Sequence, residues 1–528
     1  MVAKYQHLCL KLKLQEPSIV VEDVRWQRMI EDSSSKTLIS IQRENMKQKN
    51  SQPDWIEYDK ETGKAKGVSV ARLGEYVYSL HKEEWLMVAD GKETEFWVYR
   101  DLARKVANTS HIVHQTVWQP ASLEDVRASV HSQLKKHNLW TAKREKDATT
   151  YISGELLNNR KEKSETVGAT NPHEVLALDG VLRFDEKGNI TVVENSPAAY
   201  FTDFVTYKVK DIKKAPETDR WFQETFGTSA LTLKQFIGYM FFPTYKYIQA
   251  YVILKASGGD GKSTTINYIN SLLPESEVSH ISLQALTASE KSSKNFSLSG
   301  LRNKRLNSRN DITDDFIQDA SMLKTLTGND PIYASVKFHE DTNFTNYAKL
   351  IFACNSLPEF RDISKGFNRR AYILSARGIN GFSKKYDMNK ILQERGAFVK
   401  ECIKAFCTQI QEQAKNPDTK DWKLYRDKQT IANFADWSIS NDYVQQFLDE
   451  CAYPQSEAKG EKRALDTTYN AYATWTKNSG VKPLGKKKFN DQLREKGFKD
   501  YRTTRKGRSF RYWENLKLYS DSGNITQI

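Results

Sequence analysis

The chain has 528 residues, of which 39% are hydrophobic, and a formal net charge of +14. Its length suits about three domains of ordinary size, with enough apolar residues to give each a buried core. The excess of Lys and Arg favours a polyanionic partner, with nucleic acid ahead of an anionic membrane surface, because phosphates relieve the repulsion between clustered cations.

A membrane protein is not expected, because no stretch approaches the ~18 consecutive apolar residues of a spanning helix. The first residues also lack the apolar core of a signal peptide, so we expect a cytoplasmic location without membrane contact. The scattered cysteines form no C-x-x-C pair and therefore predict neither a zinc knuckle nor a disulfide framework. They are Cys9, Cys354, Cys402, Cys407 and Cys451.

The first part of the chain carries few functional signals. Residues 1–65 are polar and uneven, which predicts a variable N-terminal arm. Residues 66–224 mix aromatic strand-like pieces such as 95–99 with amphipathic helical ones, which predicts an α+β domain. The charged stretch 143–163 interrupts this pattern, and we expect it to be an internal flexible segment.

Residues 225–385 alternate apolar strands with helices, which predicts a mainly parallel α/β sheet. A strand at 251–254, a glycine loop at 256–264 and a helix at 265–273 follow one another, as a nucleoside triphosphate site requires. Glycines let backbone N–H groups face the phosphates, Lys262 reaches the β and γ oxygens, and Ser263 can hold Mg²⁺. Ala256 stands where the consensus loop has its first Gly. The predicted nucleotide-binding residues are Ser257, Gly258, Gly259, Asp260, Gly261, Lys262, Ser263 and Thr264.

An ATPase also needs an acid that positions Mg²⁺ and the attacking water. Asp311, 49 residues after Lys262, is the candidate. The surrounding segment 305–313 also fits a solvated acidic turn, because it is too polar for a buried parallel strand.

Two further candidates flank later strands. Asn355 follows the apolar strand 348–354, where its amide can orient water against the γ-phosphate at the carboxyl edge of the sheet. The alternative is an asparagine that only forms a turn before Leu357–Pro358. Arg369 and Arg370 precede another apolar strand and can stabilise phosphoryl-transfer charge, in their own subunit or across an interface.

The end of the chain is strongly basic. Helical spacing of apolar residues predicts a helical connector over 386–450, and residues 459–517 then carry 17 Lys and Arg against 6 Asp and Glu. Helices at 466–475 and 483–493 and a hairpin at 501–513 predict a winged-helix module within 451–528, with one helix in a DNA groove and the hairpin along the backbone. A merely solvated basic face is the alternative. The predicted DNA contacts here are Lys486, Lys487, Lys488, Arg505, Lys506, Arg508 and Arg511.

The motifs 258–264, Asp311, Asn355 and Arg369–Arg370, in this order, resemble a superfamily 3 helicase. Over roughly 68–518 the chain resembles the helicase part of the phage and plasmid primase-helicase family, which includes poxvirus helicase-primases. This resemblance implies an AAA+-like P-loop ATPase at 225–385, preceded by the family's pre-helicase domain at 66–224.

The segment 323–338 resembles the superfamily's extra motif, which in relatives builds a β-hairpin that grips DNA in the central channel of a ring. The resemblance implies a DNA-contacting tip of Lys337, Phe338 and His339. A Lys beside an aromatic ring offers a phosphate contact and a stacking platform together. An ordinary surface hairpin remains the alternative.

These features predict an ATP-dependent replicative DNA helicase of a phage, plasmid or mobile element in a bacterial cytoplasm. The resemblance implies a hexameric ring that moves 3′ to 5′ and uses ATP and Mg²⁺. Lys262 and Ser263 would hold the phosphates and Mg²⁺, Asp311 would help hold Mg²⁺, Asn355 would sense the γ-phosphate, and Arg370, or else Arg369, would reach the neighbour's nucleotide. About 65 residues precede the resemblance, too few for a primase domain, so we expect a helicase without a primase domain. A separate primase or loader is a candidate partner.

Two other functions fit part of the pattern. An origin-binding AAA+ initiator would use the ATPase as a switch and would not unwind DNA processively. A small-molecule kinase would use the same phosphate loop, but it leaves the basic tail and the hairpin motif unexplained.

Overall fold

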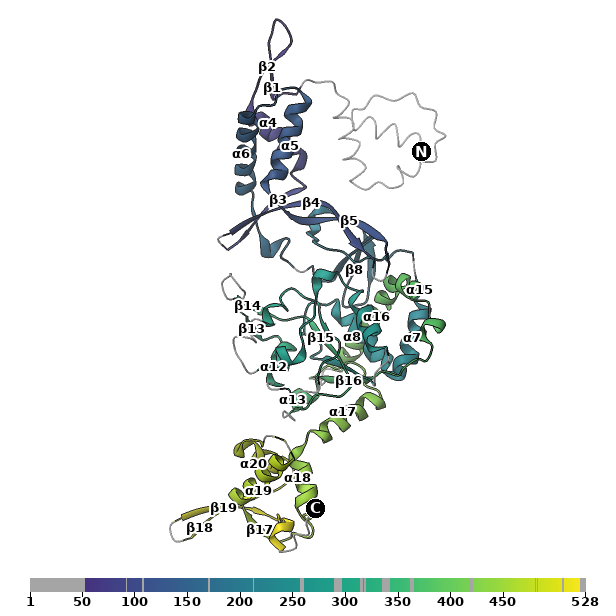
Figure 1. Cartoon of the computed structure of the whole chain (residues 1–528), viewed down its shortest axis with the longest axis vertical. Helices are drawn as coiled ribbons and strands as arrows, with labels where there is room; N and C mark the ends of the chain where they lie inside the picture. The colour runs from purple at the N-terminus through teal and green to yellow at the C-terminus, as the bar shows by residue number, and fades with distance from the viewer. Residues whose placement is uncertain are drawn as a thin grey trace. The chain divides into compact units, whose positions relative to one another are not determined.

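The computed structural model describes residues 53–91, 93–106, 109–169, 171–211, 213–256, 261–288, 297–313, 317, 320–334, 342–360, 365–416, 421–479, 481, 483–505 and 508–522. They belong to two compact units (Figure 1). The first unit comprises the described residues up to His81 together with 123–155, and the second comprises 82–122 together with the described residues from 156 onward.

The first unit is a helical body with a small hairpin. Strands β1 (Ile56–Tyr58) and β2 (Ala65–Val68) pair antiparallel, and the helices are α4 (Val70–His81), α5 (Leu123–Lys136) and most of α6 (Ala142–Asn158). Trp55 is fully buried, so the predicted arm does not extend through residues 53–65.

The expectation of a flexible segment at 143–163 is wrong for most of its length, because α6 occupies it. Ala148, Ile152 and Leu156 recur every fourth residue and are buried, which is the pattern of one helix face. The charged residues of its first turns, Lys143, Arg144, Lys146 and Asp147, are exposed or half-buried, whereas Glu145 is buried.

The second unit begins with two small sheets and two helices. One sheet has the order β5-β4-β3-β6 and the next the order β7-β8-β9. These strands are β3 (Trp85–Asp90), β4 (Glu93–Lys105), β5 (Ile112–Ala121), β6 (Lys161–Glu162), β7 (Glu174–Ala177), β8 (Gly180–Phe184) and β9 (Ile190–Val193), followed by helices α7 (Pro216–Phe226) and α8 (Ala230–Met240).

A five-stranded sheet of order β11-β12-β15-β10-β16 forms the centre of the second unit, and all its neighbouring strands are parallel. The predicted α/β fold with a parallel sheet is therefore confirmed. The strands are β10 (Tyr251–Lys255), β11 (Val278–Ser279), β12 (Leu306–Arg309), β15 (Lys349–Cys354) and β16 (Ala371–Ser375).

Both faces of this sheet are buried, as parallel sheets require. Val252 and Leu254 of β10 join one apolar cluster with residues of α7, α8 and α16 (Arg395–Ala414), whereas Tyr251 and Ile253 join a second cluster on the other face. Helices α8 and α16 pack closely at Gly238, where a Cβ atom would lie 2.0 Å from the Cys402 carbonyl oxygen.

Shorter elements surround the sheet. Strands β13 (Pro331–Ala334) and β14 (Thr342–Thr345) pair antiparallel, so the predicted hairpin strands are present. The helices are α9 (Lys262–Asn270), α10 (Leu283–Leu286), α12 (Ala320–Leu326), α13 (Lys365–Asn368), α14 (Phe382–Lys385), α15 (Met388–Gln393) and α17 (Lys428–Ser440).

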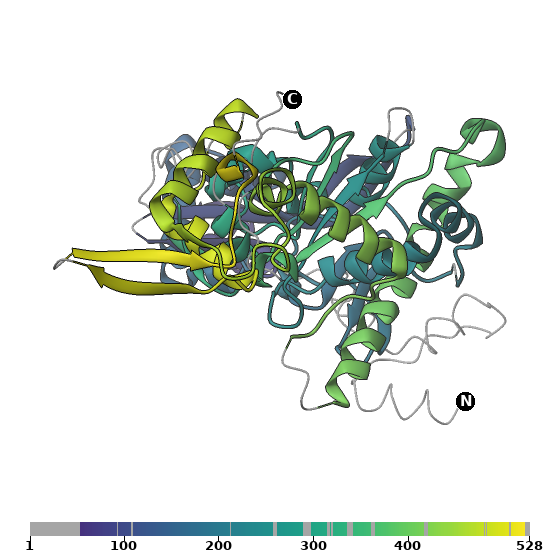
Figure 2. The ribbon, with the colours of Figure 1, turned by 90° about the horizontal axis from the view of Figure 1, so that it is seen from below.

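The last part of the chain follows the predicted order of helix, helix and hairpin. It contains α18 (Tyr443–Cys451), β17 (Lys462–Ala464), α19 (Leu465–Asn478), α20 (Lys486–Glu495), β18 (Asp500–Arg505) and β19 (Arg508–Glu514). The sheet order is β17-β19-β18, and Phe447, Phe489 and Trp513 lie in one buried cluster. Figure 2 shows β18 and β19, in yellow, extending as an arm beyond the helices of this part.

Among the helices that the structure describes, none combines the length and apolar character needed to cross a membrane.

Candidate nucleotide site and nucleic-acid interface

The ends of three neighbouring strands bring together the residues predicted to handle phosphate. In the sheet register, Lys255 at the end of β10 lies opposite Cys354 at the end of β15. On the other side of β15, the Ile312 amide donates to the Ala353 carbonyl at 2.9 Å, which holds Asp311 at the same edge. Lys262, Asn355 and Asp311 therefore follow β10, β15 and β12 at the carboxyl edge, where ligands of parallel sheets bind.

Lys262 and Asn355 are in direct contact. The Lys262 Nζ donates to the Asn355 Oδ1 at 2.6 Å and to the Ala256 carbonyl oxygen at 2.8 Å. Lys262 is buried, whereas Asn355 is exposed. Both side chains predicted to contact the γ-phosphate thus converge on one point.

Helix α9 begins as a phosphate loop requires. Gly261 precedes its first residue with φ +76°, a left-handed conformation that glycine adopts without strain. Ser263 is exposed in the first turn, and Thr264 is half-buried. The predicted loop residues Ser257, Gly258, Gly259 and Asp260 lie outside the described residues.

Asp311 is exposed just beyond β12 and has φ +50°, a conformation that Asp tolerates better than most residues. Within the described ranges no group of three or more His, Cys, Asp or Glu side chains is arranged so that it could hold a metal ion by itself. A Mg²⁺ ion here would depend on Ser263, Asp311 and phosphate oxygens, which fits its usual coordination by few carboxylates and the substrate.

The expectation that segment 305–313 is too polar for a buried strand is wrong. Leu306–Arg309 forms β12, in which Asn307 and Ser308 are fully buried. The Asn307 amide accepts from the Ile281 N–H at 2.9 Å and donates to the Ile281 carbonyl at 2.9 Å. The Ser308 hydroxyl donates to the Asn270 Oδ1 at 2.7 Å. Buried polar groups are tolerated when they are paired in this way.

Arg369 and Arg370 lie at the opposite edge of the sheet. Ala371, which starts β16, is in register with Tyr251, which starts β10, and the Tyr251 amide donates to the Arg370 carbonyl at 2.9 Å. At about 3.3 Å per residue, the length of β10 separates this amino edge from Lys262 by more than roughly 13 Å. The structure does not bring these arginines to the Lys262 site of the same chain.

The two arginines differ in accessibility. Arg370 is buried, donates to the Gly366 carbonyl and to the Gln249 Oε1, and burial lowers its pKa below the ordinary value. The Arg369 side chain is 34% exposed, forms an ion pair with Asp421, and donates to the Gln249 Oε1 at 2.8 Å. Arg369 is therefore the better placed to leave its partners for a ligand.

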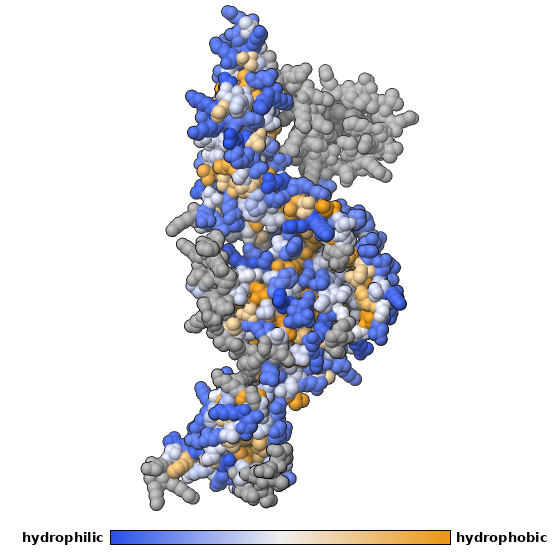
Figure 3. Space-filling view, in the orientation of Figure 1, coloured by the Kyte–Doolittle hydropathy of each residue, from blue (hydrophilic) through white to orange (hydrophobic). Residues whose placement is uncertain are grey.

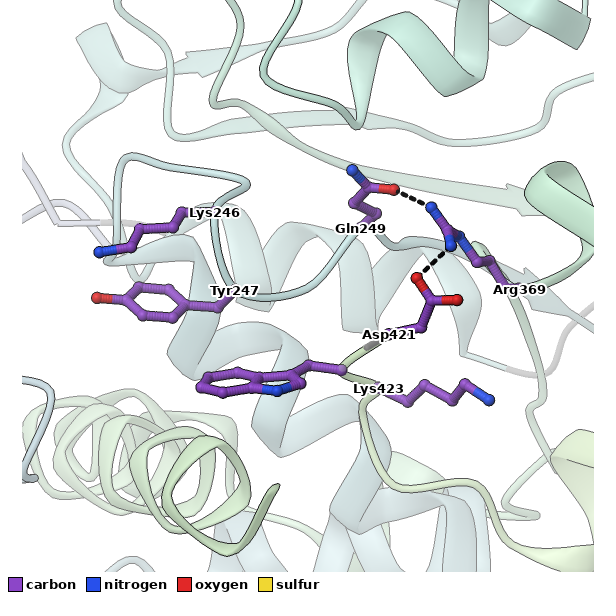
Figure 4. A pocket seen from close by; sticks show the side chains of 7 residues that line it. Lys246, Tyr247, Gln249, Arg369, Asp421 and Lys423 are labelled. Atoms are coloured by element: carbon purple, nitrogen blue, oxygen red, sulfur yellow. Dashed lines mark hydrogen bonds and ion pairs between the residues drawn. The ribbon is translucent and has the colours of Figure 1, made fainter. Parts of the chain in front are cut away.

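Arg369 lines a polar pocket that the sequence did not reveal (Figure 4). Tyr247 and Trp422 line it with nearly parallel rings, 6.3 Å between centroids and 18° between planes. Lys246 and Lys423, each next in sequence to one of these rings, supply further positive charge. In the sequence, only the adjacent pairs Lys246–Tyr247 and Trp422–Lys423 hint at this pocket. They are 175 residues apart, so the sequence does not show that they meet.

The predicted DNA-binding residues fall in two places. Lys337, Phe338 and His339 lie between β13 and β14 and outside the described residues. Lys486, Lys487 and Lys488 are exposed in the first turn of α20, and Lys486 forms an ion pair with Asp466. Arg505 and Arg508 are paired positions at the ends of β18 and β19, Arg511 is exposed on β19, and Lys506 lies outside the described residues.

Comparisons with known proteins match two separate parts of the chain, one with the phosphate-site residues and one with the basic last part. Residues 254–370 match a family of unknown function, DUF5906, and residues 439–522 match a family described as Poxvirus D5 protein-like. The first match contains Lys262, Asp311, Asn355 and Arg369; the second contains the basic last part. The second match supports a relationship to the viral primase-helicase family of replication proteins that the sequence resembles.

Two similar solved structures are apo forms of the C-terminal region of NrS-1. One is 12% identical, covers 83% of this chain and 98% of its own, and has a TM-score of 0.44. The other, of residues 305–718, is 12% identical, covers 84% of this chain and 99% of its own, and also has a TM-score of 0.44. TM-scores below 0.5 do not establish a shared overall arrangement. No curated protein matches this chain.

Proposed function

We propose that this protein is an ATP-dependent DNA helicase in the replication of a phage, plasmid or other mobile element. The observation that carries the proposal is the 2.6 Å contact between the Lys262 Nζ and the Asn355 Oδ1. It joins the lysine of a strand, loop and helix phosphate motif to a polar residue at the end of the adjacent strand, as phosphoryl transfer from ATP requires.

The side chains at this edge have complementary tasks. Lys262 exchanges its bond to Asn355 for the β- and γ-phosphate oxygens, which leaves the Asn355 amide to orient the attacking water. Ser263 and Asp311 would hold Mg²⁺, which neutralises phosphate charge when bound. The exposed position of both side chains fits this assignment.

A second subunit would complete the site. Because Arg369 lies at the amino edge and Lys262 at the carboxyl edge, Arg369 serves the nucleotide of a neighbouring chain. A closed ring, hexameric by family resemblance, repeats this contact at every interface. The arrangement supports an AAA+-like ATPase over 225–385 with ATP bound between subunits.

DNA would be held by two elements. The β13–β14 hairpin would carry Lys337, Phe338 and His339 into the ring channel and move one strand, 3′ to 5′ by resemblance. The last part would act as a winged helix. Three lysines stand in the first turn of α20, where the positive end of the helix dipole disfavours cations. Their placement costs helix stability, and an anionic partner such as DNA would offset that cost. In the host cytoplasm, a separate primase would supply primers or a separate loader would place the ring on DNA.

The test is displacement of a labelled strand from forked DNA with ATP and Mg²⁺. We expect Lys262→Ala to abolish both ATP hydrolysis and unwinding, and Lys337→Ala to abolish unwinding alone. The control Lys404→Ala, exposed on α16, should retain both activities. DNA-stimulated hydrolysis that survives Lys262→Ala would refute the proposal, whereas hydrolysis without unwinding in the unaltered protein would favour an origin-binding initiator.

A further inference from the structure

The β18–β19 hairpin has two faces with different chemistry. In its register Tyr501 lies opposite Tyr512, and Thr503 lies opposite Phe510. Since residues two apart share a face, Tyr501, Phe510 and Tyr512 line one side, which we call the aromatic face. The alternate residues, with Arg502 directly opposite Arg511, line the other side.

The three rings of the aromatic face form a continuous row. Tyr501 and Tyr512 stack with 5.7 Å between centroids and 25° between planes, and Phe510 lies 6.4 Å from Tyr512. The Lys462 Nζ lies 4.9 Å from the Tyr501 ring centroid and places a cation at one end of the row. Figure 3 shows pale orange, weakly hydrophobic surface over this hairpin beside hydrophilic surface.

Packing within the domain accounts for only part of this row. The Tyr501–Tyr512 pair stabilises the hairpin as cross-strand aromatic pairs do. Phe510 lies further toward the tip, is 41% exposed, and is not part of the buried cluster that contains Phe489 and Trp513. Its ring lengthens the aromatic face without being buried by the fold.

The opposite face of the hairpin carries positive charge that a bound anion would neutralise. Arg502 lies directly opposite Arg511, and like charges in such cross-strand pairs repel each other, although Arg502 also donates to the Ser509 hydroxyl. Both residues are exposed. Residues 459–517 carry 17 basic against 6 acidic side chains, so a phosphate chain has the complementary charge.

We propose that the aromatic face stacks on an exposed base at a junction of single- and double-stranded DNA, while Arg502 and Arg511 hold the adjoining phosphates. Bases inside a duplex have both faces covered, so protein rings stack on unpaired or terminal bases. A hairpin that only followed a duplex backbone would need the arginines and no row of rings. The inference rests on the proposed DNA-binding function and assigns this hairpin to the fork.

The experiment compares the binding of the full chain, without ATP, to a fork and to a covalently closed duplex circle that contains the same sequence and has no terminal base. The fork carries 2-aminopurine at the terminal base of its duplex. Because one base stacked on an aromatic ring contributes about 1–3 kcal/mol, we expect Phe510→Leu to reduce the preference for the fork at least about fivefold. Phe510→Trp, which keeps an aromatic ring, should retain both the preference and the change in 2-aminopurine fluorescence.

The matched control is Arg502→Gln with Arg511→Gln on the other face. This variant should weaken binding to both DNAs equally and lower the slope of log affinity against log salt by about 2. Equal affinities of unaltered protein and Phe510→Leu for the fork, with unchanged circular dichroism, would overturn the inference. Because no ATP is present, a fork preference that depends on Phe510 would stand even if the strand-displacement test failed.

Discussion

At the scale of single residues, Asn307 shows why a polar strand can be central to this sheet. Its side chain is fully buried, and it holds the Ile281 backbone through both the N–H and the carbonyl. It also accepts from the Ser279 hydroxyl at 2.9 Å. These bonds attach the short edge strand β11 to β12, and β12 positions Asp311.

Replacement of Asn307 by Leu should therefore loosen the sheet edge beside Asp311. The change leaves the half-buried Ile281 N–H and carbonyl without these partners, and each lost hydrogen bond costs about 0.5–1.5 kcal/mol. We expect faster hydrogen exchange at the backbone amides of β11 and β12. Asn343→Leu, at an exposed position on β14, is the control and should leave that exchange unchanged. Equal exchange in both variants would contradict a structural role for the Asn307 amide.

Some residue positions follow from local sequence and others do not. Lys262 and Asn355 each follow a short apolar run, so strand direction alone predicts that both lie at the carboxyl edge. The same logic, applied to arginines that precede a strand, places Arg369 at the amino edge. Its partners Gln249 and Asp421 could not be predicted, because they are 120 and 52 residues away in the chain.

At the scale of elements, α6 shows why a run of charged residues does not by itself predict a flexible segment. Glu145, in its first turn, is buried and accepts from the Arg127 Nε at 2.5 Å and bonds the His131 Nδ1 at 2.6 Å. The Trp140 indole N–H is a further donor to the same carboxylate. These partners, two of them on α5, make the charge of Glu145 compatible with burial. The sequence of α6 alone does not show which residues of α5 will pair with it.

These bonds predict a pH dependence for the first unit. The Arg127 hydrogen bond is the largest cause that lowers the pKa of Glu145 from 4.5 to about 2. A carboxyl whose pKa is lower in the folded state stabilises the fold above its unfolded pKa. That stabilisation is lost as the pH falls from about 4.5 toward 2.

Hydrogen-exchange protection factors of the α5 and α6 amides, corrected for intrinsic rates, would measure the effect. We expect the protection factors of the unaltered protein to fall between pH 5 and pH 3. The Glu145→Gln variant should have lower protection factors at pH 5, and they should fall less between pH 5 and pH 3. Glu124→Gln should behave like the unaltered protein, because the Glu124 side chain is 75% exposed and meets Arg127 only at 3.4 Å. A fall of the same size in Glu145→Gln would assign the pH dependence to other groups.

At the scale of the whole molecule, the parallel sheet separates two groups of polar residues that the sequence presents as one series. Lys262, Asp311 and Asn355 meet at the carboxyl edge, whereas Arg369 lies at the amino edge with Asp421. The spacing of motifs along the chain does not disclose this separation, since it depends on strand direction and order. An ATPase that uses all four residues needs two chains at each site.

Mixing of inactive subunits tests this requirement. We expect Lys262→Ala and Arg369→Ala each to lose ATP hydrolysis, because one lacks the phosphate lysine and the other the arginine that reaches its neighbour. In a ring assembled from equal amounts, about a quarter of the interfaces combine an intact Lys262 with an intact Arg369, so hydrolysis should partly return. A mixture of Lys262→Ala with the double variant Lys262→Ala, Arg369→Ala contains no intact site and should remain inactive. Differential tagging would confirm that mixed assemblies form. If the first mixture then shows no recovery of hydrolysis, Arg369 does not act across the interface. If Arg369→Ala alone keeps full activity, Arg369 has no part in catalysis.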